Sequence, residues 1–158
     1  MAVLKGIGPA DREAVESILR STDFFYEFEI DTALGIYDET IGKGMEGSGY
    51  YWMRIVDDDG LVAFANYGKN DFSTHSWDLY WIAVHHNSRN KKLGSILLKA
   101  VEDDVRELGG KILWIETSGR PLYASTEAFY RRNGYELAAS LKEFYGPGDP
   151  MQIYRKEL

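Results

Sequence analysis

The sequence predicts an α+β fold in which a mixed seven-stranded sheet carries helices on both of its faces. Strand-like and helix-like segments follow one another in the order strand, two helices, three strands, helix, strand, helix and two strands. The strand–helix–strand unit over residues 77–117 requires a right-handed parallel crossover, whereas the hairpins on either side of it are antiparallel. The sheet is therefore expected to be antiparallel at its start and end and parallel in its middle.

The first half of the chain supplies one short strand, two helices and a hairpin. Ala2–Lys5 is strand-like, and a helix starting near residues 9–11 places Val15, Ile18 and Leu19 on one face. A second helix is expected at residues 27–41. The four glycines that follow it predict a loop: Gly42, Gly44, Gly47 and Gly49. Strands at residues 50–56 and 61–67 are joined by an Asp-Gly step, which is a strong hairpin signal because both residues tolerate positive φ.

The second half begins with a strand at residues 77–84, rich in aromatic and β-branched side chains. The longest expected helix spans residues 93–108 and stops at Gly109-Gly110. A mostly apolar strand at residues 111–117 suits a central position in the sheet. A short helix at residues 126–132 and a hairpin of strands 135–145 and 152–156 complete a single predicted domain over residues 1–158.

Composition excludes several classes of protein. The chain has 18 Lys plus Arg against 25 Asp plus Glu, a net charge of −7, which argues against a nucleic-acid or anionic-membrane partner. It contains no cysteine, so disulfides, thiolate metal sites and a cysteine acyl-enzyme are ruled out. No signal peptide or membrane-spanning stretch is present in the sequence, and a cytoplasmic location is the expected default.

Residues 84–95 combine the end of a strand, a polar loop and a basic helix start. Four Lys or Arg and no Asp or Glu lie within residues 85–101. The free backbone N–H groups and the dipole at the start of a helix favour a bound anion. This segment of an otherwise acidic chain therefore predicts an anion site, with a solvated basic loop as the alternative.

The same segment resembles the phosphate loop of the GNAT superfamily of N-acetyltransferases, Arg/Gln-x-x-Gly-x-Gly/Ala. The matching stretch is Arg89-Asn90-Lys91-Lys92-Leu93-Gly94, in which Lys92 replaces the middle glycine. Residues 128–135 (AFYRRNGY) resemble the family's Phe-Tyr-x-x-x-Gly-Phe/Tyr signature, and residues 144–149 (FYGPGD) are similar to a turn of its bacterial members. Together with the order of elements, the resemblance covers essentially the whole chain.

The resemblance implies the GNAT form of the sheet, with strands four and five splayed apart, and acetyl-CoA as the acyl donor. The backbone N–H of Ile82 would face the thioester carbonyl, where a donor opposes developing negative charge. The residues expected to contact the coenzyme are Ile82, Ala83, Val84, Arg89, Asn90, Lys91, Lys92, Leu93, Gly94, Ser95 and Tyr130.

Three side chains are candidates for proton transfer. By resemblance, Tyr130 would lie near the coenzyme sulfur and protonate the leaving thiolate, and the alternative is a packed aromatic ring. Asp78 precedes Val84 by six residues on one strand, so strict alternation puts the two on the same face together with Tyr80. Asp78 is thus the first candidate for the base that deprotonates an ammonium acceptor, and Glu116 is the second.

The acceptor is expected to be a small-molecule or peptide amine. In this fold it would contact the first two helices and the last hairpin turn, where six aromatic and acidic residues lie: Phe25, Tyr26, Glu27, Glu29, Tyr145 and Asp149. The three histidines do not have the spacing of a metal site, and no metal is expected. Two alternatives remain, a non-catalytic acyl-CoA-binding or regulatory module and an enzyme that uses a longer acyl-CoA. The oligomeric state, monomer or homodimer, is left open.

Overall fold

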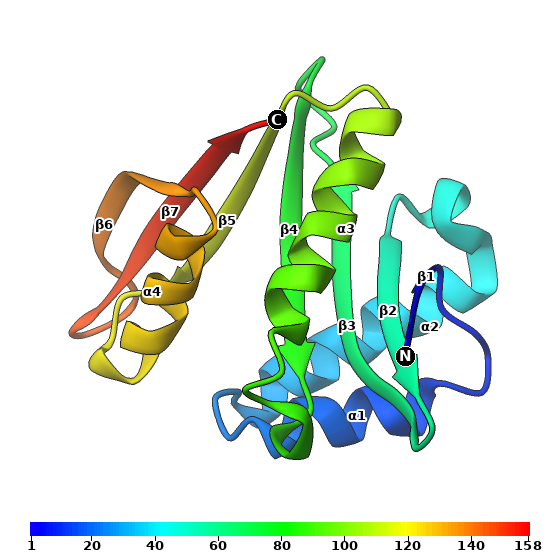
Figure 1. Cartoon of the computed structure of the whole chain (residues 1–158). Coiled ribbons are helices and arrows are strands. Elements are labelled where there is room, and N and C mark those ends of the chain that lie inside the picture. The colour runs from blue at the N-terminus through cyan, green and yellow to red at the C-terminus, as the bar shows by residue number, and fades with distance from the viewer. The chain divides into compact units, whose positions relative to one another are not determined.

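The computed structural model describes residues 1–158 and confirms the predicted order of elements (Figure 1). The helices are α1 (Arg12–Ser21), α2 (Glu27–Ser48), α3 (Leu93–Glu107) and α4 (Ala124–Arg132), with short 3-10 turns η1 (His86–Ser88) and η2 (Pro121–Tyr123). The strands are β1 (Ala2–Lys5), β2 (Tyr51–Asp57), β3 (Gly60–Lys69), β4 (Ser76–Val84), β5 (Ile112–Ser118), β6 (Glu136–Gly146) and β7 (Asp149–Glu157). None of the helices has both the length and the apolar composition needed to span a bilayer.

The seven strands follow the order β1-β2-β3-β4-β5-β7-β6. The β4–β5 pair is parallel, and the β1–β2, β2–β3, β5–β7 and β6–β7 pairs are antiparallel, as predicted. The parallel ladder ends at the pair Leu79–Ile115, although β4 continues to Val84 and β5 to Ser118. Strands four and five therefore pair only through their first four residue pairs, as the GNAT form of the sheet leads one to expect.

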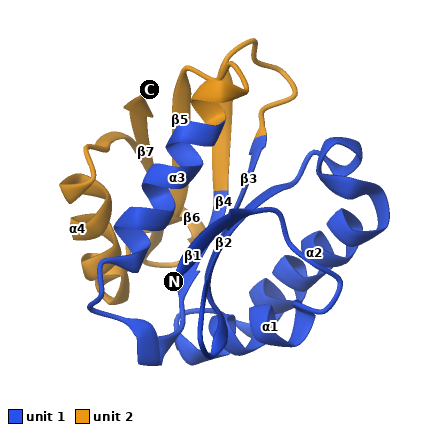
Figure 2. Ribbon diagram, turned by 45° about the vertical axis from the view of Figure 1, so that its right-hand side comes forward, with its two compact units in different colours: residues 1–68, 80–104 blue, residues 69–79, 105–158 orange.

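The chain divides into two compact units, which are coloured separately in Figure 2. Unit 1 comprises residues 1–68 and 80–104. In it, α1 and α2 pack on one face of the strands through a buried cluster that contains the predicted stripe Val15, Ile18 and Leu19 together with Trp52 and Phe64. Amphipathic helices that bury such stripes derive most of their stability from this packing.

Helix α3 covers the other face of the strands in unit 1. Tyr67 is at an odd position of β3 and points away from the face that carries Phe64, since side chains alternate along a strand. Its hydroxyl donates to Asp104 of α3, and Lys5 of β1 forms an ion pair with the same carboxylate. Helices therefore lie on both faces, as expected.

Unit 2 comprises residues 69–79 and 105–158. Its strands include the paired half of β4, β5, β7 and the edge strand β6. Helix α4 packs on one face through Tyr130, whose ring lies 5.8 Å from that of Tyr154 and 6.0 Å from that of Tyr135. Gly110, which follows α3, has no side chain at a point where Trp77 and Val105 already fill the space.

The predicted loop at residues 42–49 is wrong, because α2 extends to Ser48. Only Gly44 interrupts the helix, with φ of 77° and ψ of 171°, and Gly49 closes it in the left-handed region. Gly42 and Gly47 adopt helical geometry. A glycine permits a break in a helix without forcing one, at a cost of about 1 kcal/mol relative to alanine.

Candidate active site

The loop that joins β4 to α3 is held by backbone hydrogen bonds within unit 1. His85 N–H donates to Val62 O at 2.8 Å and pairs the end of β4 with β3. Ser88 N–H returns to His85 O at 2.8 Å, and His85 Nδ1 accepts from Asn87 N–H at 3.2 Å. These bonds shape the turn η1 and fix the direction in which the chain leaves the strand.

Two residues of the loop have left-handed backbone conformations. Asn90 has φ of 65° and Lys92 has φ of 60°. Asparagine visits this region at low cost, whereas lysine does not. Lys92 occupies the position where the GNAT loop pattern has glycine. Glycine suits this position for two reasons: it adopts positive φ without strain, and it leaves room for a ligand.

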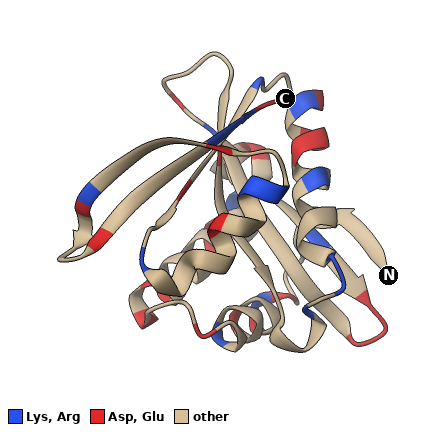
Figure 3. Ribbon diagram, turned by 60° about the vertical axis from the view of Figure 1, so that its left-hand side comes forward, with Lys and Arg blue, Asp and Glu red and all other residues tan.

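The start of α3 presents unpaired donors next to basic side chains. The first backbone bond of the helix runs from Ile96 N–H to Lys92 O at 3.1 Å, so the N–H groups of Leu93, Gly94 and Ser95 have no acceptor within it. Figure 3 shows basic residues along this loop and acidic ones only farther along the helix. Donors, dipole and charge together fit a phosphate group.

Arg89 faces the connection between α1 and α2. Its Nη2 lies 3.5 Å from Thr22 O, and its guanidinium lies 5.7 Å from the centre of the Phe24 ring. A second link joins the same segments, since His86 N–H donates to Ser21 Oγ at 3.1 Å. The loop expected to bind phosphate is therefore tied to residues that precede α2, a contact between distant segments that the sequence pattern does not reveal.

Strand β4 contains one extra residue relative to β3. Asn70 N–H donates to Ser76 O at one end of the pair, and His85 N–H donates to Val62 O at the other. Val62 and Asn70 are eight positions apart along the chain, whereas Ser76 and His85 are nine positions apart. Such a mismatch is the signature of a β-bulge.

The bulge changes which side chains of β4 share a face. The ring of Tyr80 lies 3.0 Å from the position that a Cβ would take at Gly68, on the face of β3 that also carries Phe64. Ala83 packs in the cluster of that same face. The expectation that Tyr80 and Val84 share a face is therefore wrong, because the even residue Tyr80 and the odd residue Ala83 point to the same side.

The backbone of Ile82 and Val84 keeps the expected direction. Since His85 N–H points to β3, alternation along the strand directs the N–H groups of Val84 and Ile82 to the other edge of β4. No strand pairs with that edge beyond Leu79. Ala83, between them, is buried. The unpaired edge thus offers two donors to an extended ligand.

Asp78 and Glu116 lie on the same face of unit 2. Asp78 is paired with Trp114 in the parallel ladder, and Glu116 follows Trp114 by two residues on β5. Burial raises the pKa of Asp78, and a hydrogen bond from Asn70 opposes that rise. Burial and the nearby negative charge of Asp78 raise the pKa of Glu116. Raised carboxyl pKa values are typical of general bases.

Tyr130 is buried in unit 2 with 5 % of its surface exposed. Its ring contacts Phe129, Tyr135 and Tyr154 at centroid distances of 5.4 to 6.0 Å. Burial and the neighbouring Tyr154 raise the pKa of its phenol well above the usual value. The hydroxyl is therefore kept protonated and is suited to donate a hydrogen bond to an anion.

The acidic residues expected to face the acceptor are already engaged. Glu27 accepts two bonds from Arg20, at 2.8 and 2.9 Å, and Glu29 accepts from Tyr26 N–H at the start of α2. Asp149 accepts from Ser118 Oγ and forms an ion pair with Arg120. These carboxylates stabilise the local fold and offer little free charge to an amine.

The aromatic residues expected to face the acceptor pack in pairs within each unit. Phe25 packs edge-on against Trp81 of β4 at 5.1 Å. The Tyr26 and Phe28 rings are stacked at 5.5 Å, and both side chains are at least half exposed. Tyr145, about half exposed in unit 2, packs edge-on against Phe144.

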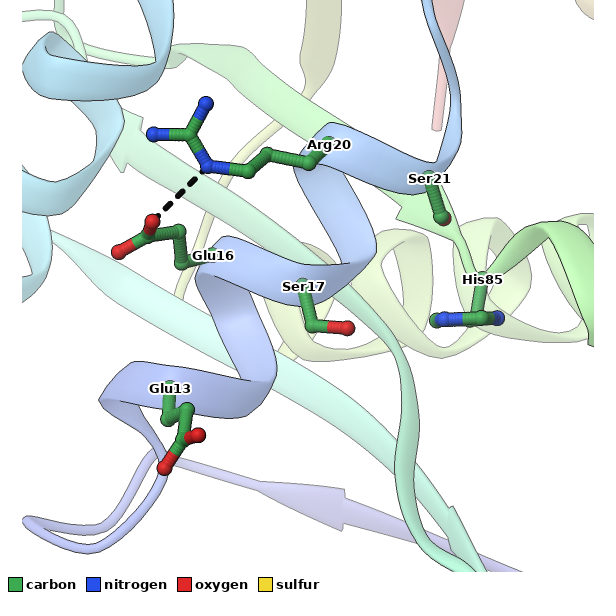
Figure 4. Close-up of a pocket in the computed structure, with 6 residues that line it drawn as sticks. All are labelled: Glu13, Glu16, Ser17, Arg20, Ser21 and His85. Carbon is green, nitrogen blue, oxygen red and sulfur yellow. Dashed lines mark hydrogen bonds and ion pairs between the residues drawn. The ribbon is translucent and has the colours of Figure 1, made fainter.

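A surface pocket of about 710 Å³ lies beside α1 in unit 1 (Figure 4). It is lined by Glu13, Glu16, Ser17, Arg20, Ser21 and His85. The guanidinium of Arg20 is already paired with Glu16 and Glu27, and no ligand is assigned to the pocket. No group of three or more His, Cys, Asp or Glu side chains in the protein is arranged to hold a metal ion.

The fold is that of acyltransferases that take their acyl group from acyl-coenzyme A. Residues 13–135 match the Acetyltransferase (GNAT) family. The chain belongs to this family of N-acetyltransferases, which confirms the resemblance inferred from the sequence.

Known proteins resemble the chain over most of its length. A putative acetyltransferase of the GNAT family from Desulfovibrio desulfuricans is 39 % identical, with a TM-score of 0.95 over 99 % of this chain and 98 % of that one. The ribosomal protein bS18-alanine N-acetyltransferase of Salmonella typhimurium is 27 % identical over 131 residues, 82 % of this chain and 85 % of the relative. An aminoglycoside 6'-N-acetyltransferase solved with coenzyme A shares the fold, with a TM-score of 0.77 and 19 % identity over 99 % of this chain and 97 % of that one.

Proposed function

We propose that the chain transfers the acetyl group of acetyl-CoA to a primary amine by direct attack in a ternary complex. The observation that carries this proposal is the start of α3. There, unpaired N–H groups, two left-handed loop residues and a run of basic side chains without acids form a phosphate site. The composition supports direct attack, because the chain has no cysteine to form an acyl-enzyme.

The coenzyme supplies an activated acetyl thioester when it is bound. Arg89, Asn90, Lys91, Lys92, Leu93, Gly94 and Ser95 would hold its pyrophosphate. Ile82, Ala83 and Val84 would hold its pantetheine arm. The Ile82 N–H donates to the thioester oxygen and opposes the charge that develops there, an effect worth about 3–4 kcal/mol in enzymes of this kind of chemistry.

Two side chains handle the protons of the reaction. Asp78 accepts a proton from the acceptor ammonium, directly or through a water, and Glu116 is the second candidate for this role. Tyr130 protonates the departing thiolate and takes up a proton from solvent in turn. The buried environment of each group supports the assignment, since it raises the pKa of Asp78 and keeps Tyr130 protonated.

The acceptor is a small-molecule or peptide amine. The relatives named above include one that acts on an alanine of a ribosomal protein and one that acts on an aminoglycoside, and in both names the transfer is to nitrogen. The aromatic residues Phe25, Tyr26 and Trp81 suit a ligand with an apolar or cationic surface. Because acetyl-CoA is available in the cytoplasm, the proposed reaction takes place there. A homodimer stays a prediction.

Lys92 favours a second candidate, a non-catalytic acyl-CoA-binding or regulatory module of the same fold. A lysine in the left-handed region replaces the expected glycine, and it carries a side chain where glycine has none. A longer acyl-CoA is an alternative acyl donor, since its coenzyme part would bind the same loop.

Calorimetric titration with CoA, acetyl-CoA and succinyl-CoA, followed by an assay of thiol release over a panel of amines and peptides, tests these candidates. Acetyl-CoA binding with amine-dependent thiol release supports the enzyme. Binding without turnover over the whole panel supports the module, and failure of all three ligands to bind rejects both.

A further inference from the structure

The turn between β3 and β4 is built around Asn70. Asn70 N–H donates to Ser76 O at 3.0 Å, and Asn70 O accepts from Ser73 N–H at 3.2 Å. The side-chain Oδ1 accepts from Phe72 N–H at 2.9 Å. These three hydrogen bonds hold the backbone and the side-chain oxygen of Asn70 in place, and none of them uses the side-chain Nδ2.

The remaining donor of Asn70 reaches the candidate base. Nδ2 lies 3.4 Å from Oδ2 of Asp78, a long hydrogen bond and the only side-chain bond that Asp78 makes. We propose that Asn70 is a positioning residue for Asp78, which orients the carboxylate and stabilises its ionised, proton-accepting form. This inference rests on the proposed function only in so far as Asp78 is the base.

The other groups around Asp78 disfavour its charge. Burial raises its pKa, and Glu116 on β5 adds a second carboxylate on the same face. Arg155 of β7 is a cation on that face, since it pairs with Trp114 and lies over the Trp114 ring at 5.5 Å. Arg155 already forms ion pairs with two glutamates, Glu136 and Glu157. Asn70 is thus the one neighbour that favours the carboxylate as a base.

The turn offers a matched control for this role. Ser73 Oγ accepts from His75 N–H at 3.1 Å and from Ser76 N–H at 2.9 Å. Ser73→Ala therefore loosens the same turn as Asn70→Ala without removing a contact to Asp78. Asn70→Asp keeps the acceptor for Phe72 N–H, removes the donor to Asp78 and adds a negative charge beside it. This variant serves if the alanine variant does not fold.

The test is a ¹³C NMR titration of the Asp78 carboxyl group in the full chain, compared with the pH profile of kcat/KM. Asn70→Ala is expected to raise the pKa of Asp78 by about half to one unit, from the loss of one charge-assisted hydrogen bond of long geometry. Asn70→Asp should raise it at least as far, and Ser73→Ala should leave it unchanged. The acid limb of kcat/KM should move in the same direction as the titration.

An unchanged pKa in both Asn70 variants, or an equal shift in Ser73→Ala, overturns the inference and leaves Asn70 with a structural role in the turn. The titration needs no turnover, so it decides the role of Asn70 even if no acceptor is acetylated. If the pKa of Asp78 shifts but the kcat/KM profile does not, Asp78 is not the base. That result would reject this part of the proposed function, while the contact between Asn70 and Asp78 would stay established.

Discussion

The hydroxyl group of Tyr67 donates a hydrogen bond of 2.6 Å to Oδ2 of Asp104, which joins β3 to α3. Lys5 Nζ lies 2.7 Å from the other carboxylate oxygen. Tyr67 is fully buried, and burial together with Asp104 raises the pKa of its phenol, so the donor stays protonated. Both oxygens of a buried carboxylate are therefore satisfied, and the helix that begins at the phosphate loop is fixed to the sheet.

Tyr67→Phe should destabilise the protein by about 1–3 kcal/mol, because it leaves a buried carboxylate oxygen without its donor. Urea unfolding followed by tryptophan fluorescence measures the change. Lys5→Met should cost less, since Lys5 is 40 % exposed and part of its pairing energy is screened by water. If Tyr67→Phe and the native protein are equally stable, the hydrogen bond makes no net contribution to the free energy of unfolding.

Lys92→Gly should stabilise the fold by about 0.5–1 kcal/mol, because glycine adopts a φ of 60° without the strain that lysine carries. If Lys92 contacts phosphate, the same change should also weaken CoA binding several-fold. Asn90→Gly is the matched control, since it frees a similar backbone angle without removing a charge. Calorimetry with CoA separates the two effects. Tighter CoA binding by Lys92→Gly would mean that the lysine obstructs the site.

Periodicity and turn chemistry predicted most of the fold from the sequence. The stripe Val15, Ile18 and Leu19 is buried as expected, and α3 begins at Leu93 where the helix was predicted to begin. Strand β4 shows the limit of this approach. Its sequence is apolar or aromatic almost throughout, so nothing in the pattern reveals that one extra residue between Tyr80 and Ala83 changes the alternation.

The part of the candidate site that one continuous segment builds, residues 89–95, could be proposed from the sequence, and its role in coenzyme binding stays a prediction. The site was not predictable where partners come from distant segments. The ion pair that engages Glu27 depends on how α1 ends, and the bonds that engage Asp149 come from residues about thirty positions earlier. The contact of Asn70 with Asp78 needs the geometry of the whole β3–β4 turn, although the Asn-Asp-Phe-Ser sequence marks that turn clearly.

Asp78→Asn should abolish most of the activity and raise the melting temperature at pH 7. The folded protein binds a proton at Asp78 more tightly than the unfolded chain does, because burial raises the pKa of this carboxyl above its ordinary value near ~3.9. Protonation of Asp78 therefore stabilises the fold. This stabilisation is fully present at pH values below the ordinary pKa and is lost as the pH rises through the pKa of the folded protein. The advantage of the variant should therefore shrink as the pH falls toward 4.

Thermal unfolding at pH 7 and pH 4.5 measures this difference, and Asp58→Asn in the exposed β2–β3 turn is the control. A variant less stable than the native protein at pH 7 would contradict the buried, charge-disfavouring environment of Asp78.

Tyr130→Phe should lower kcat by about 100-fold with little change in stability, because the ring stays packed and only the hydroxyl is lost. Tyr154→Phe is its control. Tyr154 lies beside Tyr130, and its buried hydroxyl has no hydrogen-bond partner in the protein. Removing that group should raise stability by up to about 1–3 kcal/mol and leave kcat unchanged. Steady-state kinetics with the best amine acceptor, together with urea unfolding, distinguishes the roles. Full activity of Tyr130→Phe would assign Tyr130 to packing alone.

Arg89→Ala should weaken coenzyme binding and at the same time loosen the connection between α1 and α2. The first effect follows from the loss of a cation beside the start of α3, and the second from the loss of contacts to Thr22 O and the Phe24 ring. Lys91→Ala removes an equal charge from the same loop without either contact. It should therefore weaken binding with no effect on the connection.

Hydrogen exchange at residues 22–26, measured with and without CoA, reports on that connection. In the native protein, CoA should slow exchange there, because holding the loop in one geometry also holds Arg89 against Phe24. In Arg89→Ala, exchange should be faster and should not respond to CoA at concentrations that still saturate the site. If the two variants behave alike, Arg89 acts only through its charge, and the contacts with Thr22 and Phe24 do not connect the coenzyme loop to the start of α2.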